Sequence, residues 1–540
     1  MTATPQAAPD LIVVSRRIHP LTEQKTQELN AIAVTDGIIS ALGNASDVVP
    51  LAGEHTQLIE LPGTLVPAFT DAHAHPIMSL SMARGADLSG CCSLDEVVVA
   101  LRAEAEQQGP DDWVLGWGLD PNLFVTGGIS NQVLVDALGE ERKAYVTLFD
   151  AHSAIVSPAA LAVAGIDSAR TWPSGSSVVV DAQGRPTGHL IEFEAMSQAQ
   201  AHLPEQGLDE EVAALHELLA AMAAQGIAEV HVMDMNHPRT HELLTAAEAQ
   251  GPLPVKLRIS PWCTPALSDE QCAELITIQG DGGARWRVEG VKFFIDGTVE
   301  GGTAWLETPD TKGESTASAW GEIGAYARRV AQLHAASVPT ATHAIGERGI
   351  REVVQTLAAL PSNGVQHRIE HIESVPRPVI DQLAAAGIAA SMQPTHCTHY
   401  TKADGSDDWS TRLGRDRAAR AWCTRDVLDA GAILALGSDF PVAPYPVLPI
   451  MADAQLRRPV HDSSAAPILP EQAITAAEAL AGFTTGPQRA IGRSGGTLAV
   501  GAAASFTVLD VDPLRVAPEE LAEGQVLLTV SDGLITYRAH

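Results

Sequence analysis

The stretch from residue 226 to residue 296 decides the fold, because three short apolar runs recur in it: GIAEVHVMD (226–234), LPVKLRIS (253–260) and VEGVKFFID (288–296). Stretches with helical periodicity, such as EVAALHELLAAMAAQ (211–225), lie between most runs of this kind. The remaining runs are LVPAFTDAHAH (65–75), SVPTATHAIG (337–346), HRIEHIE (367–373), GIAASMQP (387–394) and AILALGSDF (432–440). Eight strand-then-helix units predict an α/β protein with a (β/α)8 TIM-like barrel.

The flanking segments have other patterns and predict further domains. Both ends of the chain contain short apolar runs broken by Gly, Asp-Gly and Pro-Gly, which are turn signals. We therefore expect a small β-sandwich built from residues 1–64 and 491–540, around a barrel of residues 65–490. Residues 80–205 are too long for one crossover and contain their own strand signals, so they predict a subdomain inserted over the barrel mouth.

Composition limits the classes of partner. The formal net charge is −32, and a surface this acidic repels nucleic acid and anionic lipid. The six cysteines include no CxxC pair, which argues against a disulfide framework or a thiolate zinc site. Neither a signal peptide nor an apolar run of about 20 residues is visible. We expect a cytoplasmic enzyme that acts on a small molecule, without nucleic-acid or membrane partners. The sequence does not decide whether the protein forms a homodimer.

Polar residues at the strand ends are the candidate site, because barrel active sites form at the carboxyl ends of the strands. The first run ends in His73 and His75, whose side chains point the same way along a strand. A lone HxH is more often a surface pair or a pair of hydrogen-bonded histidines than a metal site.

Lys292 lies inside an apolar run in a chain with few lysines. One interpretation is a side chain whose amine reaches the rim of the barrel or pairs with a carboxylate. The other is a desolvated amine with a lowered pKa, which adds carbon dioxide to form a carbamate. A carbamate offers two oxygens and can bridge two metal ions. Spacing alone does not separate these interpretations.

Three more strand ends carry ligand-type residues, namely His343, His371 and Asp439. Each singly is best explained as a hydrogen-bonded core residue. The combination of His, Lys, His, His and Asp at the rims of five strands instead predicts a metal centre. Imidazole and carboxylate ligands without thiolate suit Zn²⁺, Mn²⁺, Fe²⁺ or Ni²⁺, and zinc is the default by availability.

This ligand series resembles that of the amidohydrolase superfamily, and the wider motifs resemble amidohydrolase family 3, in the branch that includes N-substituted formamide deformylase. The motifs run from about residue 60 to 510 and include DAHAHP, FDAHSAIVSPAAL, GRPTGHLIE, THAIGERG, RIEHIES, QPTH and GSDFPV. The resemblance implies one or two divalent metals per chain, and a barrel joined to a sandwich made from both termini.

The resemblance also implies a role for each candidate ligand. His73 and His75 would bind the more buried metal, and Asp439 would contact that metal and the nucleophilic water. Lys292, if N-carboxylated, would bridge to a second metal held by His343 and His371.

Substrate contacts are weaker predictions. His152, Gln393 and His396 match family motifs, and Trp117 is a candidate pocket wall. The family often has a Ser-Leu-Gly stretch where this chain has residues 298–302, so contacts there cannot be carried over. Arg348 and the pair at 457–458 are candidates for binding a substrate carboxylate.

These residues predict a hydrolase that cleaves a non-peptide C–N bond, in an N-substituted amide or formamide. A metal-bound hydroxide would attack the carbonyl, with Asp439 as proton shuttle. The alternatives are a mononuclear deaminase or cyclic-imine or imide hydrolase with unmodified Lys292, a non-catalytic binding or regulatory protein, and non-hydrolytic chemistry on the same metals.

Overall fold

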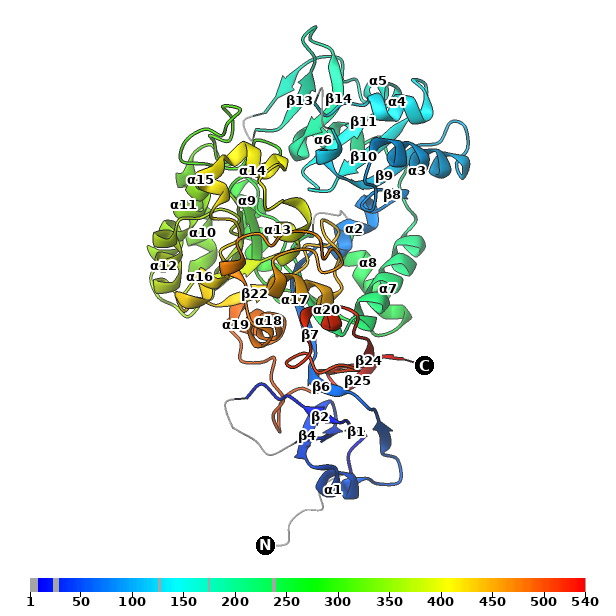
Figure 1. Ribbon diagram of the computed structural model, residues 1–540, viewed down its shortest axis with the longest axis vertical. Coiled ribbons are helices and arrows are strands. Elements are labelled where there is room, and N and C mark those ends of the chain that lie inside the picture. The colour runs from blue at the N-terminus through cyan, green and yellow to red at the C-terminus, as the bar shows by residue number, and fades with distance from the viewer. Residues whose placement is uncertain (1–7, 23–28, 125–127, 173–174, 236–238, 540) are drawn as a thin grey trace.

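A ring of parallel strands forms the centre of the molecule (Figure 1). The computed structural model describes residues 8–22, 29–124, 128–172, 175–235 and 239–539. In ring order the strands are β7 (Phe69–Ala74), β15 (Ile227–Val232), β16 (Lys256–Ile259), β18 (Val291–Phe294), β19 (Thr340–Ala344), β20 (Arg368–His371), β21 (Ala389–Met392) and β22 (Leu434–Leu436). Most are buried on both faces, as strands are when helices cover a parallel sheet.

Main-chain hydrogen bonds link the two sheets that make up the ring. The backbone N–H of Lys292 donates to the carbonyl of Pro261 at 2.9 Å, which joins β18 to the extension of β16. On the other side, the N–H of Asp439 donates to the carbonyl of His73 at 2.7 Å, which joins the end of β22 to β7. The architecture is therefore mixed α/β and TIM-barrel-like, as the alternating runs predicted.

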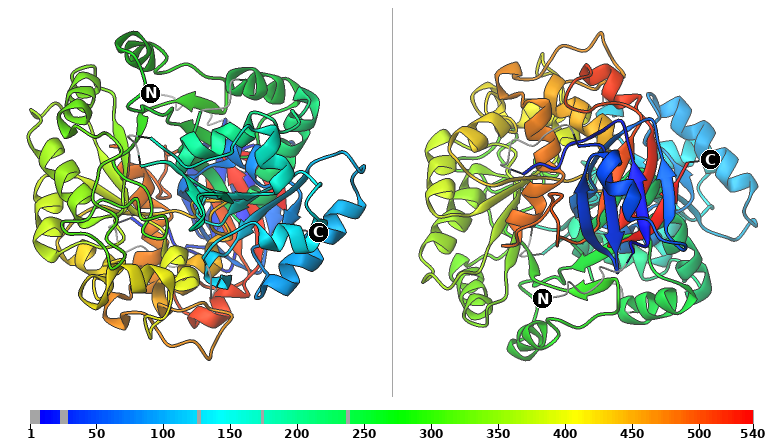
Figure 2. Two further views of the ribbon diagram at one scale, coloured as in Figure 1. Left: turned by 90° about the horizontal axis from the view of Figure 1, so that it is seen from above. Right: turned by 90° about the horizontal axis from the view of Figure 1, so that it is seen from below.

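Helices form a layer around the strands (Figure 2). They are amphipathic; α11, for example, buries Ile350, Val353 and Leu357 toward the strands. A short strand, β17 (Trp286–Val288), pairs with β16. The helices between the strands are α7 (Leu208–Ala224), α8 (Thr240–Gln250), α9 (Asp269–Thr277), α10 (Ile323–Ala335), α11 (Glu347–Ala358), α12 (Arg377–Ala385), α13 (Pro394–Tyr400), α14 (Asp408–Leu413), α15 (Arg415–Ala418) and α16 (Thr424–Asp429), followed by α17 (Val447–Leu456), α18 (Ala476–Gly482), α19 (Thr485–Ala490) and α20 (Pro518–Ala522).

The segment between α2 (Pro76–Met82) and α7 forms a separate mixed sheet with its own apolar clusters, at the top of Figure 1. The sheet order is β12-β13-β14-β11-β10-β9-β8. Its elements are β8 (Ala86–Asp87), β9 (Val114–Leu119), β10 (Ala144–Leu148), β11 (Ser153–Val156), β12 (Arg170–Thr171), β13 (Ser177–Val180) and β14 (Pro186–Ile191), with helices α3 (Leu94–Glu106), α4 (Gln132–Leu138), α5 (Pro158–Val163) and α6 (Glu192–Gln200). We call this segment the insert.

The hairpin formed by β10 and β11 reaches from the insert to the barrel mouth. At its tip, Asp150 accepts hydrogen bonds from the backbone N–H groups of His152 and Ser153, both at 3.1 Å. This Asx-type turn fixes the tip, and Ala151 within it adopts a left-handed conformation with φ 60°. The tip residues 149–152 line the pocket at the barrel mouth.

Strands from the two ends of the chain pair with each other below the barrel (Figures 1 and 2). The turns Asp36-Gly37 and Asp532-Gly533 have positive φ at both residues, as type I′ hairpin turns require. One sheet has the order β4-β3-β1-β5 and the other β2-β6-β23-β24-β25. The strands are β1 (Leu11–Val14), β2 (Arg17–Ile18), β3 (Ala31–Thr35), β4 (Ile38–Gly43), β5 (Gln57–Glu60), β6 (Thr64–Pro67), β23 (Phe506–Leu509), β24 (Val526–Ser531) and β25 (Leu534–Arg538); helix α1 (Ala45–Val48) follows β4.

Within the described part of the chain, every helix is too short or too polar to cross a lipid bilayer.

We expect Phe506→Ala to destabilise the paired terminal strands by about 3–5 kcal/mol, because removing a buried phenyl ring leaves a cavity. Phe506 is 0 % exposed in a cluster shared by both terminal sheets. Hydrogen exchange measured by mass spectrometry should show faster exchange in both 30–43 and 506–530. Val500→Ala is the control, because Val500 is 64 % exposed. Faster exchange confined to the C-terminal strands would contradict a shared core.

Candidate metal centre and active site

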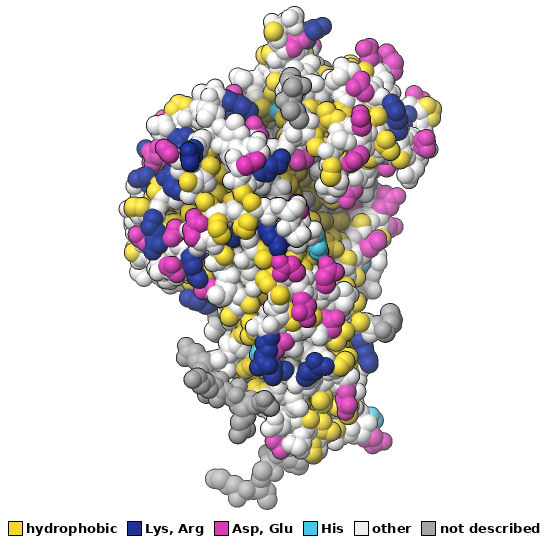
Figure 3. Space-filling view, viewed as in Figure 1, with side chains coloured by type: hydrophobic (Ala, Val, Ile, Leu, Met, Phe, Trp, Pro, Cys, Tyr) yellow, Lys and Arg dark blue, Asp and Glu magenta, His cyan; other side chains and the backbone are white. Residues whose placement is uncertain are grey.

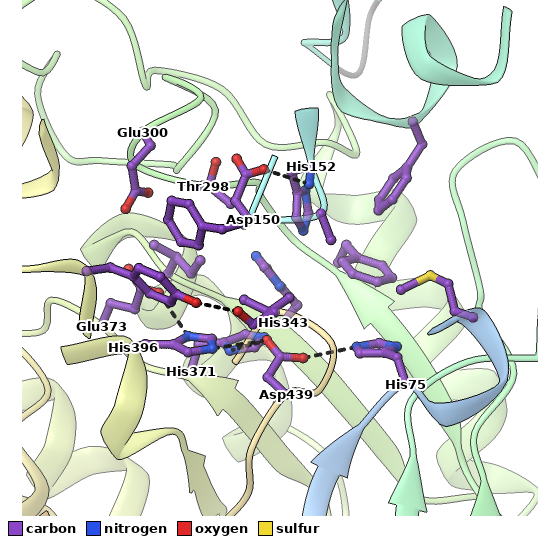
Figure 4. A pocket seen from close by; sticks show the side chains of 18 of the residues that line it. His75, Asp150, His152, Thr298, Glu300, His343, His371, Glu373, His396 and Asp439 are labelled. Atoms are coloured by element: carbon purple, nitrogen blue, oxygen red, sulfur yellow. Dashed lines mark hydrogen bonds and ion pairs between the residues drawn. The ribbon is translucent and has the colours of Figure 1, made fainter. Parts of the chain in front are cut away.

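The predicted ligands from five strand ends meet at one pocket at the barrel mouth (Figure 4). The pocket has about 650 Å³ of empty space, part of it open to solvent. His75, Lys292, His343, His371 and Asp439 all line this pocket. His73 is fully buried directly behind it. The ring of parallel strands brings these residues together although they are up to 366 positions apart in the chain (73 to 439).

Three ligand atoms form the most compact group. One atom each from His73, His371 and Asp439 lie within 4.8 Å of one another, and all three residues are buried. The Oδ1 atom of Asp439 lies 3.3 Å from His73 Nε2 and 3.2 Å from His75 Nε2. Three predicted histidine ligands therefore surround a single carboxylate, that of Asp439.

Lys292 lies beside this group. Its Nζ atom is 3.4 Å from His73 Nε2 and 4.9 Å from the centre of the Phe294 ring. Burial lowers the pKa of Lys292 to about 8, although the negative charges of Glu370 and Asp439 partly offset this shift. A substantial fraction of the amine is therefore neutral near pH 8, which is the form that reacts with carbon dioxide.

His343 extends the cluster away from His75. Its ring centre is 4.5 Å from that of His371, which is in turn 4.8 Å from that of His73. Its Nε2–H donates to the carbonyl of Gly297 at 3.2 Å. The three rings form a continuous row that runs from the pocket lining, His343 and His371, to His73 behind it.

Buried partners orient the histidines. His73 Nδ1–H donates to Glu370 Oε2 at 2.6 Å, which leaves Nε2 free to coordinate. Arg368 Nε lies 2.8 Å from the other oxygen of Glu370 and forms an ion pair with it. His371 Nδ1 is 2.9 Å from Gln393 Oε1, so Gln393 holds this ring in place.

Two predicted ligands adopt a conformation that is unfavourable for side chains with a Cβ. His371 has φ 73° and Asp439 has φ 61°. Such strain persists only where the surroundings impose it, and it is concentrated at functional sites. Near Asp439, the hydroxyl of Ser438 donates to Asp71 Oδ2 at 2.6 Å, and this bond helps to fix the turn.

Burial sets the protonation states of the cluster. Desolvation, followed by the charge of Lys292 or neighbouring histidines, holds the pKa values of His73, His343 and His371 well below the usual range, so these rings are neutral. Burial raises the pKa of Asp439, but the hydrogen bond and charge of His75 outweigh it and lower the pKa. Neutral imidazoles and an ionised carboxylate are the forms that bind metal.

The residues present fit a divalent metal ion. Asp439 Oδ1 is buried and accepts no hydrogen bond of normal geometry, although two imidazole nitrogens face it. Burying a carboxylate oxygen costs free energy unless a cation or a hydrogen-bond donor pairs with it. Nitrogen and oxygen donors without sulfur suit zinc and its neighbours in the first transition series.

The predicted substrate contacts fall into three groups. His152 and His396 line the pocket, and His396 Nε2 lies 3.5 Å from Asp439 Oδ2. Gln393 contacts His371 instead of lining the pocket. Trp117 lies in β9 of the insert and is not among the pocket-lining residues.

The arginines suggested for a substrate carboxylate lie elsewhere. Arg457 is buried and donates to the carbonyls of Ala421, Trp422 and Ile468. Arg348 pairs with acidic side chains, including Glu307 at 3.5 Å. Arg348, Arg457 and Arg458 do not line the pocket, so the structure gives no support to their binding a substrate carboxylate there.

Several pocket residues were not predicted. The walls include aromatic side chains and the acidic residues Glu300 and Glu373, the latter accepting a 2.7 Å hydrogen bond from Trp409 Nε1. Glu300 falls in the stretch that departs from the family pattern, which was the only sequence signal for it. The aromatic lining residues are Phe149, Phe193, Trp262, Phe294, Tyr400 and Trp422.

Comparison with known proteins places the chain in a family. The model of the amidohydrolase family matches residues 62–537, so this chain belongs to the amidohydrolase family. The membership and enzyme class predicted from the motifs are confirmed.

Similar proteins match over almost the whole length. YtcJ of Bacillus subtilis is 27 % identical over 516 residues, covering 94 % of this chain and 96 % of that protein. N-substituted formamide deformylase of Arthrobacter pascens is 26 % identical over 554 residues, covering 98 % of each. A metal-dependent hydrolase of Pyrococcus horikoshii superposes with a TM-score of 0.71 at 20 % identity, over 94 % of this chain and 99 % of that one.

We expect Glu370→Gln to weaken metal binding about 10- to 100-fold, the usual effect of losing an orienting carboxylate behind a ligand histidine. The variant keeps the size of the side chain but loses the charge that pairs with Arg368. Competition with a chromogenic chelator measures the affinity. Glu274→Gln, an exposed change on α9, is the control. Equal affinities for the wild type and Glu370→Gln would contradict the orienting role.

Proposed function

We propose that this chain hydrolyses a non-peptide C–N bond in an N-substituted amide, with a formamide as the favoured class. The observation that carries the proposal is the meeting of buried His75, His343, His371, Lys292 and Asp439 in one pocket, with His73 buried behind them. The similar deformylase of Arthrobacter pascens, matched over 98 % of both chains, supports the formamide.

A divalent metal held here, zinc being our expectation, would supply an activated water and polarise the substrate carbonyl. We propose two metals per chain, because six donor groups exceed the three protein ligands that a catalytic zinc normally takes. His73, His75 and Asp439 would hold one ion, and His343 and His371 the other. Lys292 would link the two as its N-carboxylate, for which its neutral amine is the required form.

Asp439 moves the proton in the proposed reaction. It accepts a proton from the attacking water and delivers it to the nitrogen as the C–N bond breaks and the C–O bond forms. The second proton of the water, left on the formic acid, passes to the amine, so the products are formate and the protonated amine, and atoms and charges balance. His396 Nε2 is buried, has no hydrogen-bond partner among the described residues, and lies beside Asp439, which suits it to bind the substrate oxygen.

We also propose the domain division expected above: a (β/α)8 barrel over 65–490, with the insert near 80–205, and one β-sandwich from 1–64 and 491–540. The pairing of β6 with β23 supports a sandwich that combines both ends of the chain. The shared apolar cluster of the two terminal sheets supports it further.

A mononuclear deaminase or cyclic C–N hydrolase is the second candidate. It is favoured by the single compact group of His73, His371 and Asp439, and by the direct contact of the Lys292 amine with His73. In that case Lys292 stays unmodified and only one ion binds.

We expect Asp439→Asn to lower kcat on N-alkylformamides about 10²- to 10⁴-fold, the range of general acid–base catalysis, because an amide cannot accept the proton. Formate and amine release from the metal-loaded enzyme measures the rate. Asp381→Asn is the control, because Asp381 is exposed on α12.

Wild-type kcat in Asp439→Asn would exclude Asp439 as the shuttle. Ammonia release from an amino-substituted heterocycle, without any formamide hydrolysis, would favour the second candidate.

A further inference from the structure

A second hollow lies between the insert and the barrel and continues into the metal pocket. It encloses about 1980 Å³, part of it open to solvent. Met78, Ala151, Phe193 and Trp262 line both spaces. Figure 3 shows a hollow flanked by apolar side chains where the upper lobe meets the body of the molecule. We call this space the side groove.

The walls of the side groove are largely apolar, but charged residues interrupt them. Asp234 lies next to the metal pocket, 3.4 Å from His75. The other charged lining residues are Arg84, Glu205, Glu211 and Arg239. Methionine side chains are flexible and adapt to ligands of different shape. The apolar wall residues other than the four shared ones include Met82, Leu115, Met196, Ala201 and Leu203.

Tyr145 also lines the groove and is 4 % exposed. Its hydroxyl lies beside the side chains of Gln200 and Thr147, which line the same groove and offer it hydrogen-bond partners. The hydroxyl therefore belongs to the wall itself, and its ring adds apolar surface to the groove.

We propose that the side groove binds an elongated apolar substituent on the substrate nitrogen, so that the substrates are amides with a long N-alkyl chain. The inference rests on the proposed function. The carbonyl carbon of a formamide carries only a hydrogen besides its oxygen and nitrogen, so any larger substituent must be attached to the nitrogen. The carbonyl would lie at the metal ligands, and the chain would pass between Met78 and Phe193 into the groove. Continuity with the metal pocket makes the substrate itself the occupant.

A chain-length series tests the proposal directly. We expect kcat/KM to rise about fourfold per methylene from N-ethyl- to N-octylformamide, the effect of moving each methylene from water into an apolar site. In parallel, binding of N-ethyl- and N-octylurea, which the enzyme need not cleave, is measured by calorimetry. The octyl compound should bind at least 100-fold more tightly.

Groove variants identify the surface responsible. Met82→Gln and Leu203→Gln place an amide on half-buried wall positions. Each should reduce the octyl-to-ethyl ratio at least threefold, in kcat/KM and in urea binding. Val99→Gln is the matched control, because Val99 is 66 % exposed on the outer face of the insert. If the two groove variants fail to fold, Met82→Leu, which preserves the apolar wall, should retain the ratio.

The outcomes separate the two claims. Hydrolysis of short formamides with no gain from chain length would overturn the side-groove proposal and leave the proposed function intact. Tight octylurea binding that the groove variants weaken, without hydrolysis of any formamide, would support the groove and contradict the proposed function. If Met82→Gln and Leu203→Gln leave the preference for the octyl compound unchanged, the octyl group binds outside the side groove, and the proposal is overturned.

Discussion

The hydrogen bond from His73 to Glu370 is the interaction on which the site depends. It connects β7 to β20 across the barrel interior at 2.6 Å. Arg368 forms an ion pair with the other carboxylate oxygen of Glu370. Charged groups this deeply buried are tolerated only when each is paired and hydrogen-bonded, and removing one partner leaves an uncompensated charge. The chain thus places an orienting network under the ligands, and that network fixes His73 Nε2 toward Asp439 before any ion binds.

The two halves of the site have different origins. The strands of the ring supply the proposed metal ligands, so the arrangement of these residues follows from the strand pairing itself. The insert supplies the walls through the hairpin tip at 149–152 and through Phe193 at the start of α6. This division lets the reaction chemistry stay constant while the insert determines which substrates fit, because loops and subdomains above a barrel vary without disturbing the strands.

The sequence predicts the ligands better than it predicts the walls. A residue at the carboxyl end of a barrel strand faces the mouth wherever the strand lies, so the strand pattern predicts that His343, His371 and Asp439 gather there. Their roles as metal ligands come from the family resemblance and stay a prediction. Which face of β9 or of the 149–152 turn meets the pocket depends on how the insert docks. For that reason Trp117 was proposed as a wall, whereas Phe149 and Phe193 line the pocket. Glu370 could have been found, since Arg368 and Glu370 alternate along a strand and share a face.

Metal content per chain tests the central claim most directly. Protein purified without an affinity tag or chelator, with bicarbonate present, is analysed by plasma mass spectrometry alongside Lys292→Ala. The account predicts two equivalents of a divalent metal in the wild type and a clear loss in Lys292→Ala. One equivalent that Lys292→Ala leaves unchanged would contradict the bridging role of Lys292 and favour a mononuclear enzyme.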